Sequence, residues 1–254
     1  MSEADYVCGI HAVNQLIAEK PRTLRRLLIA TGRSDARIQG IREKAREAGI
    51  RVDQIDRHAL ERMTRDAFSG QGRIAHQGIL AECHAVVPAD EAELEARWDT
   101  FNNPLILVLD GLEDPRNLGA CLRSADAVGV DAVLVPRRHS APFSAAVRKT
   151  ASGALESLFV VQVSNLARRL KWLQDQGAWL VGADDSAAAE YTEVDMTVPL
   201  VMVLGSEGAG IRRLTKDLCD FVVSIPMAGV VSSLNVSVAT GVLLFECLRQ
   251  RREK

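Results

Sequence analysis

The chain has 254 residues, of which 47% are hydrophobic and 25% are charged, which is enough to bury a sizeable core in one domain or two. Its five cysteines are scattered and form no Cys-x-x-Cys pair, which argues against a disulfide framework and a zinc site. No apolar run approaches the roughly 20 residues that span a bilayer, and the start MSEADYVC lacks the order of a signal peptide. We therefore expect a cytoplasmic protein without a metal or a membrane contact.

The net charge of −2 is distributed unevenly along the chain. Residues 1–80 carry 14 Lys and Arg against 10 Asp and Glu, whereas the rest carries 17 against 23. This asymmetry predicts a basic N-terminal module beside a more acidic one. The alternative is that Arg-rich stretches such as 37–51 are solvated helix faces.

The first 80 residues predict a small α/β unit. Helical periodicity is present at 9–18 and 35–48, and short apolar runs at 27–30 and 50–52 indicate strands. The sequence then turns acidic, and we interpret residues 81–103 as a linker with about one helical turn. A second domain is expected at 104–254.

That second domain alternates six apolar runs with helical patterns. Such alternation indicates βαβ units, so we predict an α/β fold with a mostly parallel sheet covered on both faces. The runs are 105–109, 132–135, 159–161, 179–181, 200–204 and 221–225.

Ligands of open parallel sheets bind beyond the carboxyl ends of the strands, so the loops after residues 109, 204 and 225 are candidate sites. The first loop, DGLEDPRNLG at 110–119, precedes a helix that Asn117 is expected to cap. Arg123 lies off the apolar stripe of that helix and suits a two-point contact with a phosphate or carboxylate. In isolation, an ordinary capped helix with a surface arginine explains the segment at least as well.

The second loop, LGSEGAGI at 204–211, has three glycines that permit close approach of a ligand to the backbone. It lacks both the dinucleotide fingerprint and the phosphate-loop Gly-Lys-Ser/Thr. Glu207 suits a hydrogen bond to a hydroxyl or amine; alternatively, it only places a favourable negative charge near a helix N-terminus.

The third loop, IPMAGVVSSLN at 225–235, leads into an apolar helix at 236–248. Its Ser and Asn residues could simply cap that helix.

Together and in this order, the three segments resemble the motifs of the SpoU/TrmH family of knotted RNA ribose 2′-O-methyltransferases. The motifs are DPRNLGACLRS at 114–124, LGSEG at 204–208, and IPM at 225–227 with SLNVS at 233–237. More weakly, VCGIHAV at 7–13 resembles the opening of the RlmB-like branch, which has an N-terminal substrate-binding domain and methylates a guanosine in the peptidyl-transferase region of 23S ribosomal RNA. The resemblance implies S-adenosylmethionine as cofactor, large-subunit ribosomal RNA as partner, a homodimer, and a C-terminal trefoil knot of the SPOUT type.

The resemblance also assigns residues, position by position. It implies catalytic roles at Asn117, Arg123, Glu207, Ser233 and Asn235. It implies cofactor contacts at Leu204, Gly205, Ile225, Met227 and Leu234. The pair Val230-Val231 departs from the family pattern without removing a polar group, and the helix face with Val238, Val242, Phe245 and Leu248 suits either a dimer interface or core packing.

Other readings stay open at this point. Within the family, a transfer RNA or an antibiotic-resistance ribosomal target is an alternative. A nucleotide-dependent oxidoreductase would need a dinucleotide glycine fingerprint, which the sequence lacks. A non-catalytic RNA-binding scaffold would be expected to have lost the polar motif residues, whereas this sequence keeps all of them. Aromatic residues are only 4% of the chain, which argues against an aromatic stacking platform.

Overall fold

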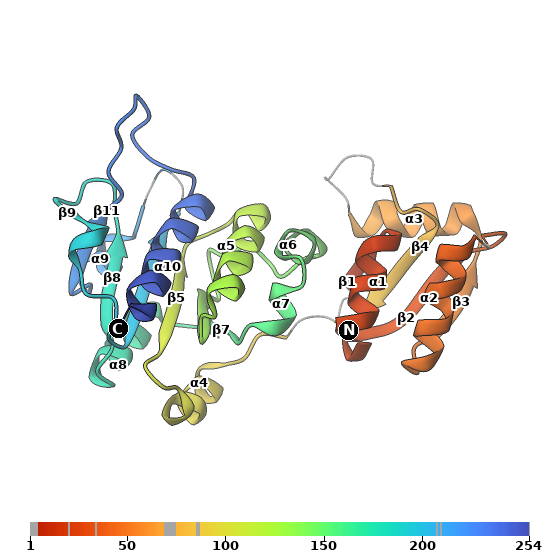
Figure 1. Cartoon of the computed structure of the whole chain (residues 1–254), viewed down its shortest axis with the longest axis horizontal. Helices are drawn as coiled ribbons and strands as arrows, with labels where there is room; N and C mark the ends of the chain where they lie inside the picture. Colours follow the sequence, from red (N-terminus) through yellow and green to blue (C-terminus); the bar gives the residue numbers. More distant parts are fainter. Residues whose placement is uncertain are drawn as a thin grey trace. The chain divides into compact units, whose positions relative to one another are not determined.

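The structure is a computed structural model that describes residues 5–19, 21–33, 35–68, 75–84, 87–206, 208 and 210–253. The chain divides into two compact units (Figure 1). One unit contains Met1–Val87 and Phe143–Glu156, and the other contains Pro88–Pro142 and Ser157–Lys254. Within the described ranges, none of the helices combines the length and the apolar character needed to cross a bilayer.

The first unit is a four-stranded mixed sheet with the strand order β1-β4-β2-β3. Strand β4 runs antiparallel to β1 and β2, and β2 runs parallel to β3. Helices α1 and α2 pack on one side of the sheet around Leu27 and Ile29, and α3 covers the other side around Leu28 and Leu80. The elements are β1 (Asp5–Cys8), α1 (Ile10–Glu19), β2 (Leu24–Ala30), α2 (Ala36–Glu47), β3 (Arg51–Ile55), α3 (Arg57–Ala67) and β4 (Ile79–Cys83).

The second unit is built on a seven-stranded sheet with the order β7-β6-β5-β10-β8-β11-β9. Every strand pair in it is parallel, and each of the six apolar runs overlaps one strand, so the prediction of a mostly parallel α/β sheet is confirmed. The strands are β5 (Leu105–Asp110), β6 (Ala132–Pro136), β7 (Val160–Val163), β8 (Trp179–Ala183), β9 (Ala189–Glu190), β10 (Leu200–Gly205) and β11 (Phe221–Ser224). The helices are α4 (Glu91–Arg97), α5 (Pro115–Val128), α6 (Ala145–Ala151), α7 (Ala154–Ser157), α8 (Leu166–Asp175), α9 (Arg213–Lys216) and α10 (Val236–Arg252), of which α6 and most of α7 belong to the first unit.

Helices cover both faces of this sheet, which explains why its strands read as continuous apolar runs. Alternate side chains such as Ile106 and Val203 pack with α4 and α8 in one core. On the other face, α5 and α10 pack against each other, and α10 also reaches β10. Figure 1 shows the loop between β11 and α10 projecting beyond the end of β11.

The stretch expected to be a linker, 81–103, has more structure than predicted. Cys83 ends β4, and α4 has seven residues and begins after Asp90, which caps it in a capping box with Glu93. Leu94 is fully buried in the core of the second unit. The acidic residues of this stretch therefore have structural roles. Asp90 caps a helix. Glu91 forms an ion pair with the buried Arg169, whose Nη2 lies 2.8 Å from the Glu91 carboxylate.

Candidate functional site

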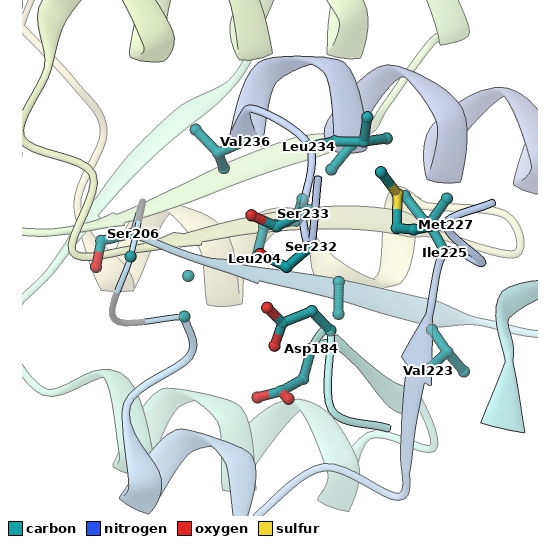
Figure 2. A pocket seen from close by; sticks show the side chains of 16 residues that line it. Asp184, Leu204, Ser206, Val223, Ile225, Met227, Ser232, Ser233, Leu234 and Val236 are labelled. Atoms are coloured by element: carbon teal, nitrogen blue, oxygen red, sulfur yellow. The ribbon is translucent and has the colours of Figure 1, made fainter. Parts of the chain in front are cut away.

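The loops at the carboxyl ends of β8, β10 and β11 surround a cavity of about 330 Å³, which lies within the range of small-molecule pockets (Figure 2). Leu204 and Gly205 enter it from β10, and Ile225, Met227 and Leu234 from the loop before α10. Figure 2 shows Asp184 on the opposite side of the cavity from Met227 and Leu234. All five residues assigned to the cofactor by sequence resemblance thus line one cavity, together with Ser233.

The glycine-rich turn after β10 is closed by its own backbone. Ser206 N donates to Gly210 O at 3.1 Å, and Gly210 N donates to Ser206 O at 3.0 Å. A Cβ atom on Gly205 would lie 1.9 Å from the carbonyl carbon of Gly210, so only glycine fits there. Gly208 and Gly210 have positive φ angles of 78° and 65°, which glycine adopts without strain. Gly205 is therefore needed for the turn itself, in addition to any contact with a ligand.

The start of α5 differs from the expectation that Asn117 caps it. Asp114 is the N-cap, and its Oδ1 accepts from Arg116 N at 2.7 Å. Pro115 occupies the first helical position, where its missing N–H costs nothing, so the helix begins three residues earlier than expected. Asn117 is consequently free of the capping role, and its Oδ1 accepts from Asn235 Nδ2 at 3.2 Å.

Asn235 joins the first and third motifs. Its Oδ1 accepts from Ser237 N at 2.9 Å and from Ser237 Oγ at 2.6 Å, so it caps α10. The same amide contacts Asn117, 118 residues away in sequence. Capping and motif convergence, which the sequence offered as alternatives, are thus properties of one side chain.

The remaining two catalytic assignments are placed differently. Arg123 lies on α5 with an exposed side chain, and it lines neither the cavity above nor the second one described below. Glu207 lies outside the described residues.

A second cavity of about 520 Å³ adjoins the first and shares Ser206 with it. Asn117 and Asp114 line it from the first motif, and Asp110 and Arg212 also line it. Asp110 is completely buried, and its Oδ1 accepts from Arg212 Nε at 2.7 Å and also from Nη2. This hydrogen-bonded carboxylate raises the pKa of Arg212, so the guanidinium stays charged.

Sequence reasoning missed the loop after β8, where Asp184 and Asp185 line the first cavity. Burial raises the pKa of Asp184, but the Lys216 ammonium at 2.8 Å and hydrogen bonds from Ser186 outweigh burial and lower it. The signal was available, since β8 is a buried parallel strand and its carboxyl end is where ligands gather. Arg212 was missed because nothing local marks it as the partner of Asp110.

The first cavity fits S-adenosylmethionine. Among the lining residues that the structure describes, the ionisable ones are Asp184 and Asp185, and two carboxylates suit a ligand that carries a sulfonium and an ammonium group. The rest of the lining is glycine backbone, serine hydroxyls and apolar side chains. This mixture of a mostly apolar wall with a few polar groups is typical of small-molecule sites.

Comparison with known proteins identifies both parts of the chain. Residues 6–88 match the model for the substrate-binding domain of RNA 2′-O ribose methyltransferases, and residues 104–245 match that of the SpoU rRNA methylase family. A protein from Pseudomonas putida named 23S rRNA (guanosine-2′-O-)-methyltransferase RlmB is 46% identical over 255 residues, covering 100% of both chains. The protein of that name from Pseudomonas aeruginosa is 47% identical over 252 residues, covering 99% of this chain and 98% of its own.

Solved structures agree with this assignment. The SpoU methyltransferase AviRb from Streptomyces viridochromogenes, in complex with the cofactor AdoMet, superimposes with a TM-score of 0.77 at 26% identity, covering 99% of this chain and 92% of AviRb. A TrmH/SpoU tRNA modifying enzyme from A. aeolicus has a TM-score of 0.55 at 30% identity, covering 63% of this chain and 85% of its own. With more than half of its length matched by the family model and relatives near 45% identity over its full length, the chain belongs to the SpoU rRNA methylase family.

Proposed function

We propose that this protein transfers the methyl group of S-adenosylmethionine to the ribose 2′-hydroxyl of a guanosine in 23S ribosomal RNA. The observation that carries the proposal is the convergence of the second and third motif loops on one cavity, with Asn117 of the first motif bonded to Asn235 of the third. The guanosine and the ribosomal RNA are supported by the full-length similarity to proteins named 23S rRNA (guanosine-2′-O-)-methyltransferase. S-adenosylmethionine, when bound, supplies a methyl group attached to a positively charged sulfur.

The residues of this chain then have to orient the acceptor ribose and accommodate the charge that develops as its hydroxyl loses a proton. Guanidinium keeps its proton under nearly all protein conditions, so Arg123 is assigned to phosphate anchoring and charge stabilisation, and not to proton removal. Ser233 and Asn235 orient the nucleotide, with Asn117 holding the amide of Asn235. Glu207 holds the loop or the nucleotide, and the proton leaves through phosphate or water.

Replacement of Arg123 by alanine tests this division of roles. Because Arg123 does not line the cofactor cavity, we expect the affinity for S-adenosylmethionine to change little. The methyl-transfer rate should fall strongly, because the proposed phosphate anchoring and charge stabilisation are lost. Lysine at this position should rescue poorly, since two-point contact is lost. Calorimetry and single-turnover kinetics separate the two effects, and loss of cofactor binding with normal turnover at saturation would contradict the assignment.

RNA recognition is assigned mainly to a substrate-binding domain at residues 1–80, with the catalytic domain at 104–254. The match of residues 6–88 to a substrate-binding model and the positive charge of this part of the sequence support that role. Phosphate contacts give RNA binding that weakens steeply with salt. The affinity for ribosomal RNA fragments should therefore fall as salt rises, while the affinity for the cofactor should change much less.

We also propose a homodimer built on α10. On the face expected from sequence, Val238 and Phe245 are 51% and 52% exposed and Val242 and Leu248 are half-buried. The buried side of the helix carries Leu243 and Leu244. Two exposed apolar side chains seven residues apart suit a partner helix. Sedimentation should give a dimer, and Phe245→Glu should give a monomer.

A trefoil knot and a cytoplasmic location complete the proposal. The knot is supported by the path of the chain, because after β11 it returns past β8 and β10 to pack α10 against α5. Cytoplasmic location is supported by the proposed substrate, which is present where ribosomes are assembled.

The decisive experiment maps 2′-O-methyl groups in all RNA from cells with and without the gene. We expect one guanosine of 23S ribosomal RNA to lose its methyl group and to regain it when the purified protein and S-adenosylmethionine are supplied. A lost methyl group in transfer RNA would redirect the proposal to another target. No uptake of the cofactor by folded protein in calorimetry, with or without RNA, would refute it.

A further inference from the structure

Arg212 is held in place by a carboxylate that has no contact with solvent. Asp110 ends strand β5, and its side chain is 0% exposed. Thr215 Oγ1 donates to its Oδ2 at 2.8 Å, and Arg212 Nε and Nη2 donate to its Oδ1. A buried charge is costly unless it is paired and hydrogen-bonded. The arrangement therefore fixes the guanidinium of a residue that sits 102 positions away in sequence.

The fixed guanidinium faces the second cavity. Its side chain is 49% exposed, and the cavity that it lines also contains Asn117 and Ser206. Ser206 borders the cofactor cavity as well, so a group in this space is next to the point where methyl transfer is proposed. Arg212 donates to Asp110 through Nε and Nη2, and no other acceptor for its guanidinium occurs in the described part of the chain.

The charges around this cavity favour a neutral ligand over a phosphate. Beyond the Asp110–Arg212 pair, Glu113 and Asp114 contribute two carboxylates, and the other basic side chain, His139, lies 3.5 Å from Glu113. A phosphate would meet this excess of negative charge. A nucleobase with acceptors for the guanidinium and donors for a carboxylate is complementary to it.

Guanine has that pattern. Its O6 and N7 atoms accept, and arginine contacts them in the commonest base-specific interaction of proteins with nucleic acid. Its N1–H and N2–H₂ groups, on the adjoining edge, are donors that a carboxylate such as Glu113 accepts. Adenine offers only N7 and a donor on the edge that arginine would read.

We propose that Arg212, positioned by Asp110 and Thr215, reads the O6 and N7 edge of the target guanine, and that the cavity between the first and second motifs is the acceptor-base site. This inference rests on the proposed function, because it assigns the base at the same reaction centre. It makes Arg212 the residue that selects guanosine.

The test replaces one atom of the RNA. After the methylated guanosine has been mapped, a synthetic 23S fragment carries either guanosine or 7-deazaguanosine at that position, and thermal melting verifies that both RNAs fold alike. Unaltered protein should methylate the 7-deaza RNA with kcat/KM about tenfold lower, since one hydrogen bond to a charged group is lost. This comparison needs no protein variant and so does not depend on folding.

Variants then assign the effect to one side chain. Arg212→Lys should lower kcat/KM on guanosine RNA by roughly 5- to 150-fold and abolish the difference between the two RNAs. Arg213→Lys is the matched control, because the neighbouring Arg213 is 93% exposed and should behave like the unaltered protein. Calorimetry with S-adenosylmethionine should be close to normal for both variants, whereas the melting temperature should fall for Arg212→Lys alone, because lysine does not restore both hydrogen bonds to the buried Asp110.

Two results would overturn the inference, and a third would refute the proposed function on which it rests. Equal methylation of both RNAs by the unaltered protein removes the N7 contact while leaving the proposed function intact. A loss in Arg212→Lys with an undiminished preference for guanosine over 7-deazaguanosine assigns Arg212 to a phosphate or to the fold. No methylation of the guanosine RNA at all refutes the proposed function instead.

Discussion

Replacement of Gly205 by alanine is the sharpest test of the geometry around the cofactor cavity. The new Cβ would lie 1.9 Å from both the carbonyl carbon and the oxygen of Gly210, whereas ordinary contacts begin at 3.4 Å, so the turn must move by about 1.5 Å. That movement breaks the two backbone hydrogen bonds between Ser206 and Gly210. Overpacking of this kind costs about 1–3 kcal/mol and each of the two hydrogen bonds about 1 kcal/mol, which gives a total of about 3–5 kcal/mol.

The assay is calorimetry with S-adenosylmethionine, read beside thermal unfolding of the same protein. If only 2 kcal/mol is lost from the preformed site, the Kd rises by about 30-fold. Gly229→Ala is the control, because it adds the same methyl group in the third-motif loop, where no atom lies within 4 Å of the new Cβ. Cofactor affinity in Gly205→Ala within threefold of the unaltered protein would refute the argument that this turn shapes the site.

Three further predictions concern stability and reactivity. Gly40→Ala in the middle of α2 should stabilise the protein by about 1 kcal/mol in urea unfolding, because no atom lies within 4 Å of the new Cβ and alanine favours the helix. Burial raises the pKa of Glu91, but hydrogen bonds from Ser164, Arg169 and Arg168 outweigh it and lower the pKa to about 2. Its stabilisation is therefore complete above the usual pKa of 4.5 and disappears as the pH falls towards 2, so the melting temperature of Glu91→Gln should lie below that of the unaltered protein at pH 6 and converge with it near pH 2. Burial raises the pKa values of Cys219 and Cys247 to about 12, so neither thiol should react with iodoacetamide at pH 8 in the folded protein. Mass spectrometry should find both residues alkylated only after unfolding, and alkylation of either in the native protein would contradict the prediction.

The sheet of the second unit was predictable because parallel strands covered on both faces must be apolar throughout. Runs such as Leu105–Asp110 and Leu200–Gly205 are buried at every position, and that continuity distinguishes them from the half-exposed helices between them. Once the strands are known, the loops at their carboxyl ends are the expected ligand sites, which is why the cavity lies where sequence placed it. The order of the strands, with β10 between β5 and β8, has no local signal.

Features that depend on distant partners were not predictable. The cap of α5 was misplaced because Asn117 and Asp114 are both good cap residues, and Pro115 decides between them by favouring the first helical position. The acidic stretch before β5 was interpreted as a solvent-exposed linker, yet Glu91 accepts a hydrogen bond from the buried Arg169, 78 residues away in sequence. Such pairs depend on the fold and produce no periodic pattern in the sequence, so sequence analysis does not detect them.

Asn235 shows why a capping interpretation and a catalytic one need not compete. A cap fixes the amide plane, because Oδ1 must accept from Ser237 at the first turn of α10. With Oδ1 committed to the helix, Nδ2 is the end that faces Asn117, and the two asparagines hold the first and third motifs together. The proposed role of Asn235 in orienting a ribose would gain precision from this constraint, since its rotamer is set before any ligand arrives. The helix-capping pattern and the family motif at residues 232–235 therefore share one hydrogen-bonded side chain, that of Asn235.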